Sequence, residues 1–340
     1  MEKMKKLGPP LLRFAHPMAF AVYLRGYGAR SDYYLRKSGL PTLCEDPTAF
    51  APLPRIWSFF DSASRSEMPE LGWLVGANAG DRQISTTLLR KLESAPTLLQ
   101  ALRRFERLYK LEVTDSEIGI KEHQNSIWLY TRYKGKRDEP GYHVSQAYQL
   151  GVFVGLIRHF LGENWVPHEI GIESKLIPPG AAECYPGSRI LTEQPAGYIV
   201  VPRWRLHESA SFGEQGIGKA EKIPLKDHFL SEMRTDCESR LRLVLKSYLS
   251  EGYISQEKAA ELMDTSVRTL TRRLVAHGLT YRTLIDDLRF ETAKEQLLKS
   301  DKRIGDIAQS VGFNHQADFT RMFKRVGGVS PKEFRQSVKS

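Results

Sequence analysis

The sequence predicts an α+β domain over residues 1–205, a linker over 206–230 and an all-α domain over 231–340. Two observations predict this fold class. The first part of the chain mixes helical and strand-like spacings of apolar residues, whereas the part after Pro224 is strongly helical and contains one proline, Pro331. Between them, the region 206–230 is rich in Gly, Ser, Glu, Gln and Lys, which is typical of an interdomain linker. A length of 340 residues suits about two domains.

Helices and strands alternate in the predicted α+β domain. Apolar residues recur every three or four positions in Pro96–Tyr109 and Ser145–Leu161, which predicts two helices, the first capped by Ser94 or Thr97. Strands are predicted over Glu112–Ile120 and Ser126–Tyr133, paired through a turn at 123–125. Further elements are a helix over Pro54–Ser64 and short strands over His168–Ser174 and Gly197–Val201.

The chain is basic, with a net charge of +10 and a pI of about 9.4. Such a surplus favours an anionic partner, either nucleic acid or a membrane surface. Residues 231–340 hold 20 Lys and Arg against 15 Asp and Glu, so half of the surplus lies in a third of the chain. No segment has 18 uninterrupted apolar residues, and Pro17 interrupts the apolar stretch Phe14–Leu24 near the N-terminus. We therefore expect a cytoplasmic protein without a membrane partner.

An internal repeat lies in the predicted all-α domain. One copy spans Ala259–Gly278 and the other spans Ile307–Gly328, and 270–274 (LTRRL) aligns with 319–323 (FTRMF). Each copy predicts a helix, a tight turn and a second helix. The stretch Tyr281–Lys299 joins the two copies and carries its own helical stripe, which predicts a rigid connector helix.

The turns and second helices of the two copies match the requirements of a helix-turn-helix. The turn needs a residue that tolerates positive φ, which Gly312 does best and Asp264 does acceptably. The second helix must bury one stripe and expose the other, as a recognition helix in a major groove does. The expected buried stripes are Leu270, Leu274 and His277 in the first copy and Phe319, Phe323 and Val326 in the second.

The exposed faces of the second helices supply candidates for DNA contact. Arginine can donate to guanine O6 and N7 together, glutamine can pair with adenine, and other cations bind phosphates. The base-contact candidates are Arg268, Thr269, Arg272, Gln316, Ala317 and Thr320. The phosphate-contact candidates are Arg273, Arg321, Lys324 and Arg325. A charged helix face is otherwise simply solvated; two copies in register favour DNA binding.

The region Tyr253–Arg335 resembles the AraC/XylS family of bacterial transcription regulators. The resemblance is carried by Gly312-Phe313, 319–325 (FTRMFKR), 328–331 (GVSP) and Phe334-Arg335. It implies a regulator, expected to be an activator, that binds double-stranded promoter DNA and meets RNA polymerase there. Asp318 is unusual for the family, because it adds a carboxylate to the second recognition helix. It either accepts a hydrogen bond from a cytosine amino group or pairs with Arg321 or Lys324.

The N-terminal part resembles the arabinose-binding-type sensor of many family members, at Glu70–Gly76 and Ser94–Leu102. This resemblance implies that residues 1–205 bind a small-molecule effector or form a homodimer. The sequence does not identify effector-binding residues. Five of its aromatic side chains suit either a pocket or an ordinary core: Trp57, Phe59, Phe60, Trp73 and Tyr148.

Catalytic, metal and cofactor motifs are not found. The sequence contains no H-E-x-x-H, no C-x-x-C and no phosphate-binding loop, so we expect no enzyme activity, no metal and no cofactor. The alternative is a nucleic-acid-processing enzyme that uses the helix-turn-helix pair only for attachment. Such an enzyme would need a methyl-accepting or metal-binding cysteine set, which the scattered Cys44, Cys184 and Cys237 do not supply. A third alternative is a basic helical interaction protein, which the repeat disfavours.

Overall fold

A computed structural model describes the chain over residues 8–44, 46, 48–78, 88, 92, 94–133, 139–209, 236–252 and 254–339. Most of the linker predicted at 206–230 lies outside these residues. The chain divides into two compact units. We call Ala15–Leu40 with Leu53–Ser231 the α+β unit, and Met1–Phe14 with Pro41–Pro52 and Glu232–Ser340 the helical unit.

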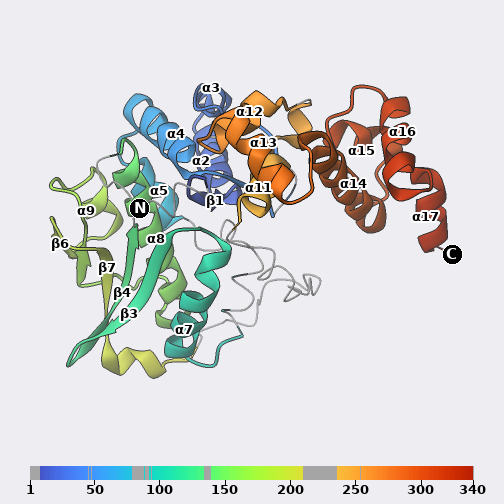
Figure 1. Cartoon of the computed structure of the whole chain (residues 1–340). Coiled ribbons are helices and arrows are strands. Elements are labelled where there is room, and N and C mark those ends of the chain that lie inside the picture. The colour runs from blue at the N-terminus through green and yellow to red at the C-terminus, as the bar shows by residue number, and fades with distance from the viewer. Residues whose placement is uncertain are drawn as a thin grey trace. The chain divides into compact units, whose positions relative to one another are not determined.

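The α+β unit contains a five-stranded sheet with the strand order β3-β4-β7-β5-β6 (Figure 1). All neighbouring strands are antiparallel except β5 and β6, which are parallel. The predicted pairing of the first two strands is confirmed, with Ile118 opposite Thr131. The strands are β3 (Ser116–Glu122), β4 (Ser126–Tyr133), β5 (Glu169–Gly171), β6 (Arg189–Leu191) and β7 (Gly197–Pro202).

Helices pack against this sheet, and α8 (Tyr142–Leu161) contacts both β7 and α5 (Leu71–Ala77). Glycine permits the close approach of α8 and α5, because a Cβ at Gly151 would lie 2.5 Å from the carbonyl carbon of Gly76. The other helices are α2 (Ala15–Gly26), α3 (Ser31–Lys37), α4 (Leu53–Ser66), α7 (Leu98–Leu108), η1 (Tyr109–Leu111), α9 (Ala181–Cys184) and η2 (Arg203–His207).

The predicted elements of this unit exist, β4 with its predicted bounds and the others with shifted ends. Thr97 caps α7 by accepting a hydrogen bond from the backbone N–H of Gln100. Strand β3 begins at Ser116 rather than at residue 112, because Asp115 adopts a positive φ of 61° that interrupts an extended backbone. The five aromatic residues that suited either a pocket or a core are buried in the core. Trp57 is flanked there by the rings of Tyr133 and Tyr142.

The helical unit contains the predicted repeat. Its helices are α11 (Cys237–Tyr248), η3 (Leu249–Glu251), α12 (Gln256–Leu262), α13 (Val267–Ala276), α14 (Tyr281–Lys299), α15 (Ile304–Ser310), α16 (Gln316–Gly327) and α17 (Pro331–Lys339). We call α12 with α13 the first helix-turn-helix and α15 with α16 the second. The connector α14 has its predicted bounds.

Two strands from the N-terminal part of the chain also belong to the helical unit. Strand β1 (Leu11–Arg13) pairs antiparallel with β2 (Phe50–Pro52), and β2 packs against α11. Leu11 and Phe50 are fully buried in one hydrophobic cluster with α11, α12 and α13. The hydroxyl of Ser247 donates to the Phe50 carbonyl at 3.1 Å. The structural division thus differs from the predicted boundary at residue 205, because three-residue strands leave almost no periodic signal.

No helix in the described part of the chain is both long enough and apolar enough to cross a membrane.

Candidate nucleic-acid interface

The two helix-turn-helix pairs have the turn conformation that the sequence predicts. Asp264 follows α12 with a φ of 49°, and Gly312 follows α15 with a φ of 83°. Both values lie in the left-handed region, which glycine adopts freely and aspartate tolerates. Ala260 and Ala308 are buried where the helices of each pair meet. The repeat therefore encodes the same backbone turn twice.

The recognition helices α13 and α16 begin differently. Ser266 caps α13, since its hydroxyl accepts a hydrogen bond from the backbone N–H of Thr269 at 3.2 Å. His315 precedes α16 and makes no side-chain cap, but Asp318 places a negative charge in the first turn. A carboxylate there interacts favourably with the helix dipole. Each start therefore has its own source of stability.

The buried stripes follow the prediction except at one residue. Leu270 and Leu274 are buried on α13, and Phe319 and Phe323 on α16. His277 was expected in the first stripe, and this is wrong. Helix α13 ends at Ala276, so His277 leaves the helical stripe and lies exposed, with its Nδ1 3.7 Å from a Glu238 carboxylate oxygen.

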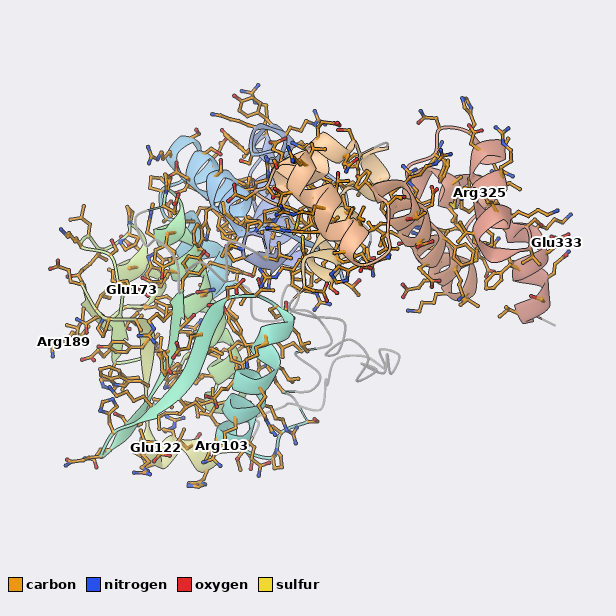
Figure 2. All side chains as sticks on the ribbon, viewed as in Figure 1. Arg103, Glu122, Glu173, Arg189, Arg325 and Glu333 are labelled. Carbon is orange, nitrogen blue, oxygen red and sulfur yellow. The ribbon has the colours of Figure 1, made fainter. Side chains whose placement is uncertain are left out.

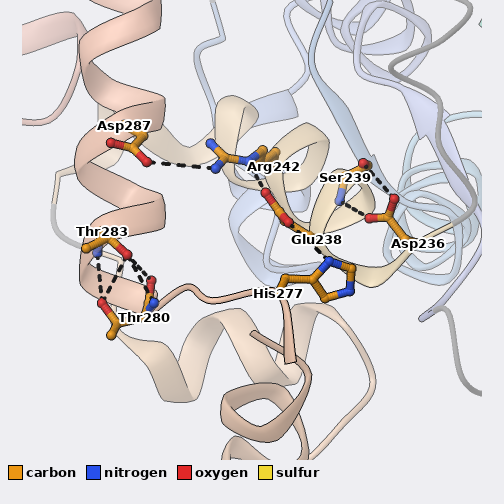
Figure 3. Close-up of polar contacts among 8 residues, drawn as sticks. All are labelled: Asp236, Glu238, Ser239, Arg242, His277, Thr280, Thr283 and Asp287. Atoms are coloured by element: carbon orange, nitrogen blue, oxygen red, sulfur yellow. Dashed lines mark hydrogen bonds and ion pairs between the residues drawn. The ribbon is translucent and has the colours of Figure 1, made fainter. Parts of the chain in front are cut away.

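Polar contacts tie α11 to the end of α13 and to the connector (Figure 3). Glu238 of α11 accepts from Arg242 at 3.0 Å and also faces His277. Arg242 in turn lies 4.0 Å from Asp287 of α14. The connector begins with a capping box, in which Thr280 and Thr283 each accept from the other's backbone N–H. These contacts link α11 to the C-terminal end of the first recognition helix and to the connector.

On α13 the outward face is cationic. Arg268 and Arg272 are exposed, and neither forms an ion pair with any described residue. Arg273 is half-buried instead and points back to the Cys237 sulfur, 3.6 Å away. Thr269 is half-buried beside the Ser266 cap. The first recognition helix therefore presents two guanidinium groups that are available to an anionic partner.

On α16 the outward face is partly neutralised. Arg321 forms an ion pair with Asp318 of the same helix, which is one of the two alternatives left open for that carboxylate. Arg325 donates to Asp286 of the connector at 2.7 Å. Gln316, Ala317 and Lys324 are exposed, and Thr320 donates its hydroxyl proton to the Gln316 carbonyl at 2.9 Å. Figure 2 labels Arg325, which lies on α16.

Helix α17 packs its first turn by a reciprocal cap. The backbone N–H of Ser330 donates to the Glu333 carboxylate at 2.7 Å, and the Glu333 N–H donates to the Ser330 hydroxyl at 3.3 Å. The backbone bond, with help from the hydroxyl, holds the pKa of Glu333 below its usual range. Figure 2 labels Glu333 on this helix. Phe334 packs against the same cluster as Phe323.

Two helix-turn-helix pairs with solvent-facing recognition helices define the class of double helix-turn-helix proteins. Residues 259–337 match the family model of a helix-turn-helix domain. Residues 28–208 match the model of the N-terminal arabinose-binding domain of AraC transcription regulators. Because this second match covers more than half of the chain, the chain belongs to the AraC family of transcription regulators. It is a DNA-binding regulator with an N-terminal domain of the arabinose-binding type, and nothing supports the enzyme alternative.

Among curated relatives, the regulator VqsM of Pseudomonas aeruginosa is 23% identical over 260 residues, which are 72% of this chain and 76% of that protein. The transcriptional activator RhaS of Escherichia fergusonii is 34% identical over 118 residues, 34% of this chain and 42% of RhaS. The solved structure of the regulator CdpR from Pseudomonas aeruginosa aligns with 90% of this chain and 96% of its own, at 19% identity and a TM-score of 0.38. These relatives are transcriptional regulators.

Proposed function

We propose that the chain controls transcription by inserting α13 and α16 into successive major-groove segments of double-stranded promoter DNA. One observation carries this proposal: α13 exposes Arg268 and Arg272 without an intramolecular ion pair among the described residues, above a fully buried apolar stripe. Free guanidinium groups can donate to guanine and phosphate without first breaking a protein contact. A recognition helix needs this combination of anchor and donors.

The base contacts are assigned to the outward side chains near the start of each recognition helix. Arg268, Thr269 and Arg272 serve the first box of the DNA site, and Gln316, Ala317 and Thr320 serve the second. Because the two sets differ, the two boxes differ in sequence. Recognition helices on one face of the duplex enter the groove about one turn, or 34 Å, apart.

The phosphate contacts are assigned to Arg273, Arg321, Lys324 and Arg325. Arg321 and Arg325 hold carboxylate partners, so each must exchange or share an ion pair when DNA arrives. The Arg321–Asp318 pair is exposed, and such a pair contributes about 0–1 kcal/mol, whereas Asp286 is only 13% exposed, so Arg325 exchanges its partner less readily. The affinity of α16 for DNA phosphates is therefore lower than the number of its cations suggests.

The α+β unit is assigned to effector binding or to homodimer formation through residues 1–205, and so to control of the DNA-binding helices. The chain passes between the two units after Phe14, Leu40 and Pro52, and β2 continues into α4 without an intervening residue. The two units are thus joined covalently at β1 and β2. We also propose RNA polymerase as a partner at the promoter, and a cytoplasmic, nucleoid-associated location.

Selection of DNA by the full-length chain tests the two-box assignment. Duplexes chosen from a randomised pool should hold two unlike boxes about 10 bp apart, and footprinting should protect both. Protection of a single box of 4–5 bp would contradict the proposal, because one recognition helix would then account for all binding.

Binding of the selected duplex with and without small-molecule extract tests the sensor assignment. A coupling of roughly 1–3 kcal/mol is typical of an effector that prefers one state. The regulatory role of residues 1–205 would be contradicted if no extract fraction changed the DNA affinity, the oligomeric state or the transcriptional output of the chain.

A further inference from the structure

The two helix-turn-helix units have separate hydrophobic cores that meet inside the connector. Residues of α14 up to Leu288 belong to the core of the first unit. From Phe290 onward they pack into the core of the second. Arg289 lies between these two residues and is only 7% exposed. A buried cation therefore occupies the boundary between the two cores.

Arg289 contacts the segment before the first helix-turn-helix and the turn of the second. Its Nη2 donates to the Gly252 carbonyl at 3.2 Å, and Gly252 ends the short η3 segment that precedes the first helix-turn-helix. Its guanidinium carbon lies 4.7 Å from the centroid of the Phe313 ring, which follows the turn of the second. A buried cation is costly unless it is partnered, and the planar guanidinium can stack and donate at once.

The turn of the second helix-turn-helix lies directly against the same segment. A Cβ at Gly312 would stand 2.4 Å from the Leu249 carbonyl oxygen and 2.7 Å from that of Gly252. Real Cβ atoms essentially never approach so closely, so any side chain at 312 would push the second unit away. The backbone of Leu249–Gly252, Arg289 and the Gly312-Phe313 turn thus form one junction, which we call the seam.

We propose that Arg289 is a positioning residue that fixes the separation of the two recognition helices, and that it thereby sets the spacing the protein accepts between its two DNA boxes. This inference rests on the proposed two-box function. Each base pair of spacing moves the second box by about 3.4 Å along the duplex and rotates it by about a tenth of a turn. A rigid seam cannot follow that change, whereas a loosened seam can.

The test compares full-length wild type with Arg289→Met and Arg289→Lys on the duplex that the wild type selects from a random pool. Versions of that duplex carry one base pair inserted or deleted between the boxes. Two linked DNA-binding modules bind more tightly than either one alone only when both can occupy their sites at once. A spacing that prevents this lowers the affinity. Wild type should lose about tenfold or more per inserted pair, and Arg289→Met about threefold or less.

Base substitutions within either box should affect Arg289→Met and wild type alike, because Arg289 donates to Gly252 and stacks on Phe313, and neither of these residues is a base-contact candidate. Arg289→Lys keeps the charge but not the planar stacking, so it should restore only part of the spacing discrimination. A merely structural role would lower affinity at every spacing by one factor and leave the ratio unchanged, which would overturn the inference. Since the readout is a ratio, loss of folded protein cancels.

Gly312→Ala and Gly328→Ala form a matched pair. Both glycines have a φ near 80°, but a Cβ at Gly328 would meet nothing within 4 Å. Gly312→Ala should relax the spacing ratio, and Gly328→Ala should not. Equal ratios would refute the seam. If wild type selects duplexes with one box, both the two-box function and this inference fail; if Arg289→Met keeps a strict spacing on two boxes, only this inference fails.

Discussion

The two helix-turn-helix pairs have the same backbone fold, but the arginines of their recognition helices differ in their intramolecular contacts. On α13, Arg268 and Arg272 form no ion pair with described residues. On α16, Arg321 and Arg325 are engaged by Asp318 and Asp286. The same fold thus supports one recognition helix with two free guanidinium groups and another whose two arginines already have carboxylate partners. We therefore propose that the first helix-turn-helix contacts DNA more directly and that the second depends more on being held in position.

The cores of the two units differ as well. The second is completed by aromatic residues of its own helices and connector, such as Phe290, Phe319 and Phe323. The first is completed by Leu11 and Phe50, which come from the opposite end of the chain. The two copies of the repeat are therefore stabilised differently. Residues distant in sequence complete the core of the first copy, and residues nearby in sequence complete the core of the second.

The largest expected effect would come from removing one ring from each core. Phe50→Ala and Phe319→Ala should each cost about 3–5 kcal/mol, because both side chains are fully buried. Hydrogen exchange should rise first over 259–276 in Phe50→Ala and over 307–326 in Phe319→Ala. If Phe50→Ala left exchange in 259–276 unchanged, β2 would not be part of the first core.

Next in size is loss of a free donor. Arg268→Ala should weaken binding to the selected duplex by about 1–3 kcal/mol and relax the preference at one base position. Arg321→Ala serves as the matched control, since its guanidinium is already paired, and it should weaken all sequences mildly and alike. The measurement is affinity for a set of single-base variants. An equal loss on specific and unrelated DNA for Arg268→Ala would exclude base contact.

The N-termini of α13 and α16 differ by about one side-chain capping hydrogen bond. Ser266→Ala should destabilise the helical unit by about 0.5–2 kcal/mol, because the Thr269 N–H loses its acceptor. His315→Ala makes the corresponding change at α16, where no side-chain cap exists, and should have little effect. Thermal unfolding of the full chain would compare the two. Similar losses would mean that His315 stabilises α16 in another way.

The smallest effect is expected at the Asp318–Arg321 pair. Arg321 is 80% exposed, so the pair itself contributes less than about 1 kcal/mol to stability. Asp318→Ala removes a negative charge from the DNA side and releases Arg321, so affinity should rise a few-fold and fall more steeply with salt. If Asp318→Ala instead relaxed the preference for cytosine at one position, the carboxylate would be a base contact.

Much of the candidate interface could be predicted from sequence because it depends on local order. The buried stripes follow from helical spacing, and the existence of the connector helix follows from its own apolar periodicity. The turn residues Asp264 and Gly312 follow from the rarity of residues that accept positive φ. His277 was misplaced because periodicity does not mark where a helix stops.

By itself, the sequence determined the family, the repeat, the connector and the outward faces of α13 and α16, since each is written in neighbouring residues. The tertiary structure alone decided three things. It placed β1 and β2 in the first core, it paired Arg325 with Asp286, and it brought Arg289 to both Gly252 and Phe313. All three join positions at least 24 residues apart. Spacing along the chain specifies which face a residue occupies, but only the packed fold specifies what lies opposite that face.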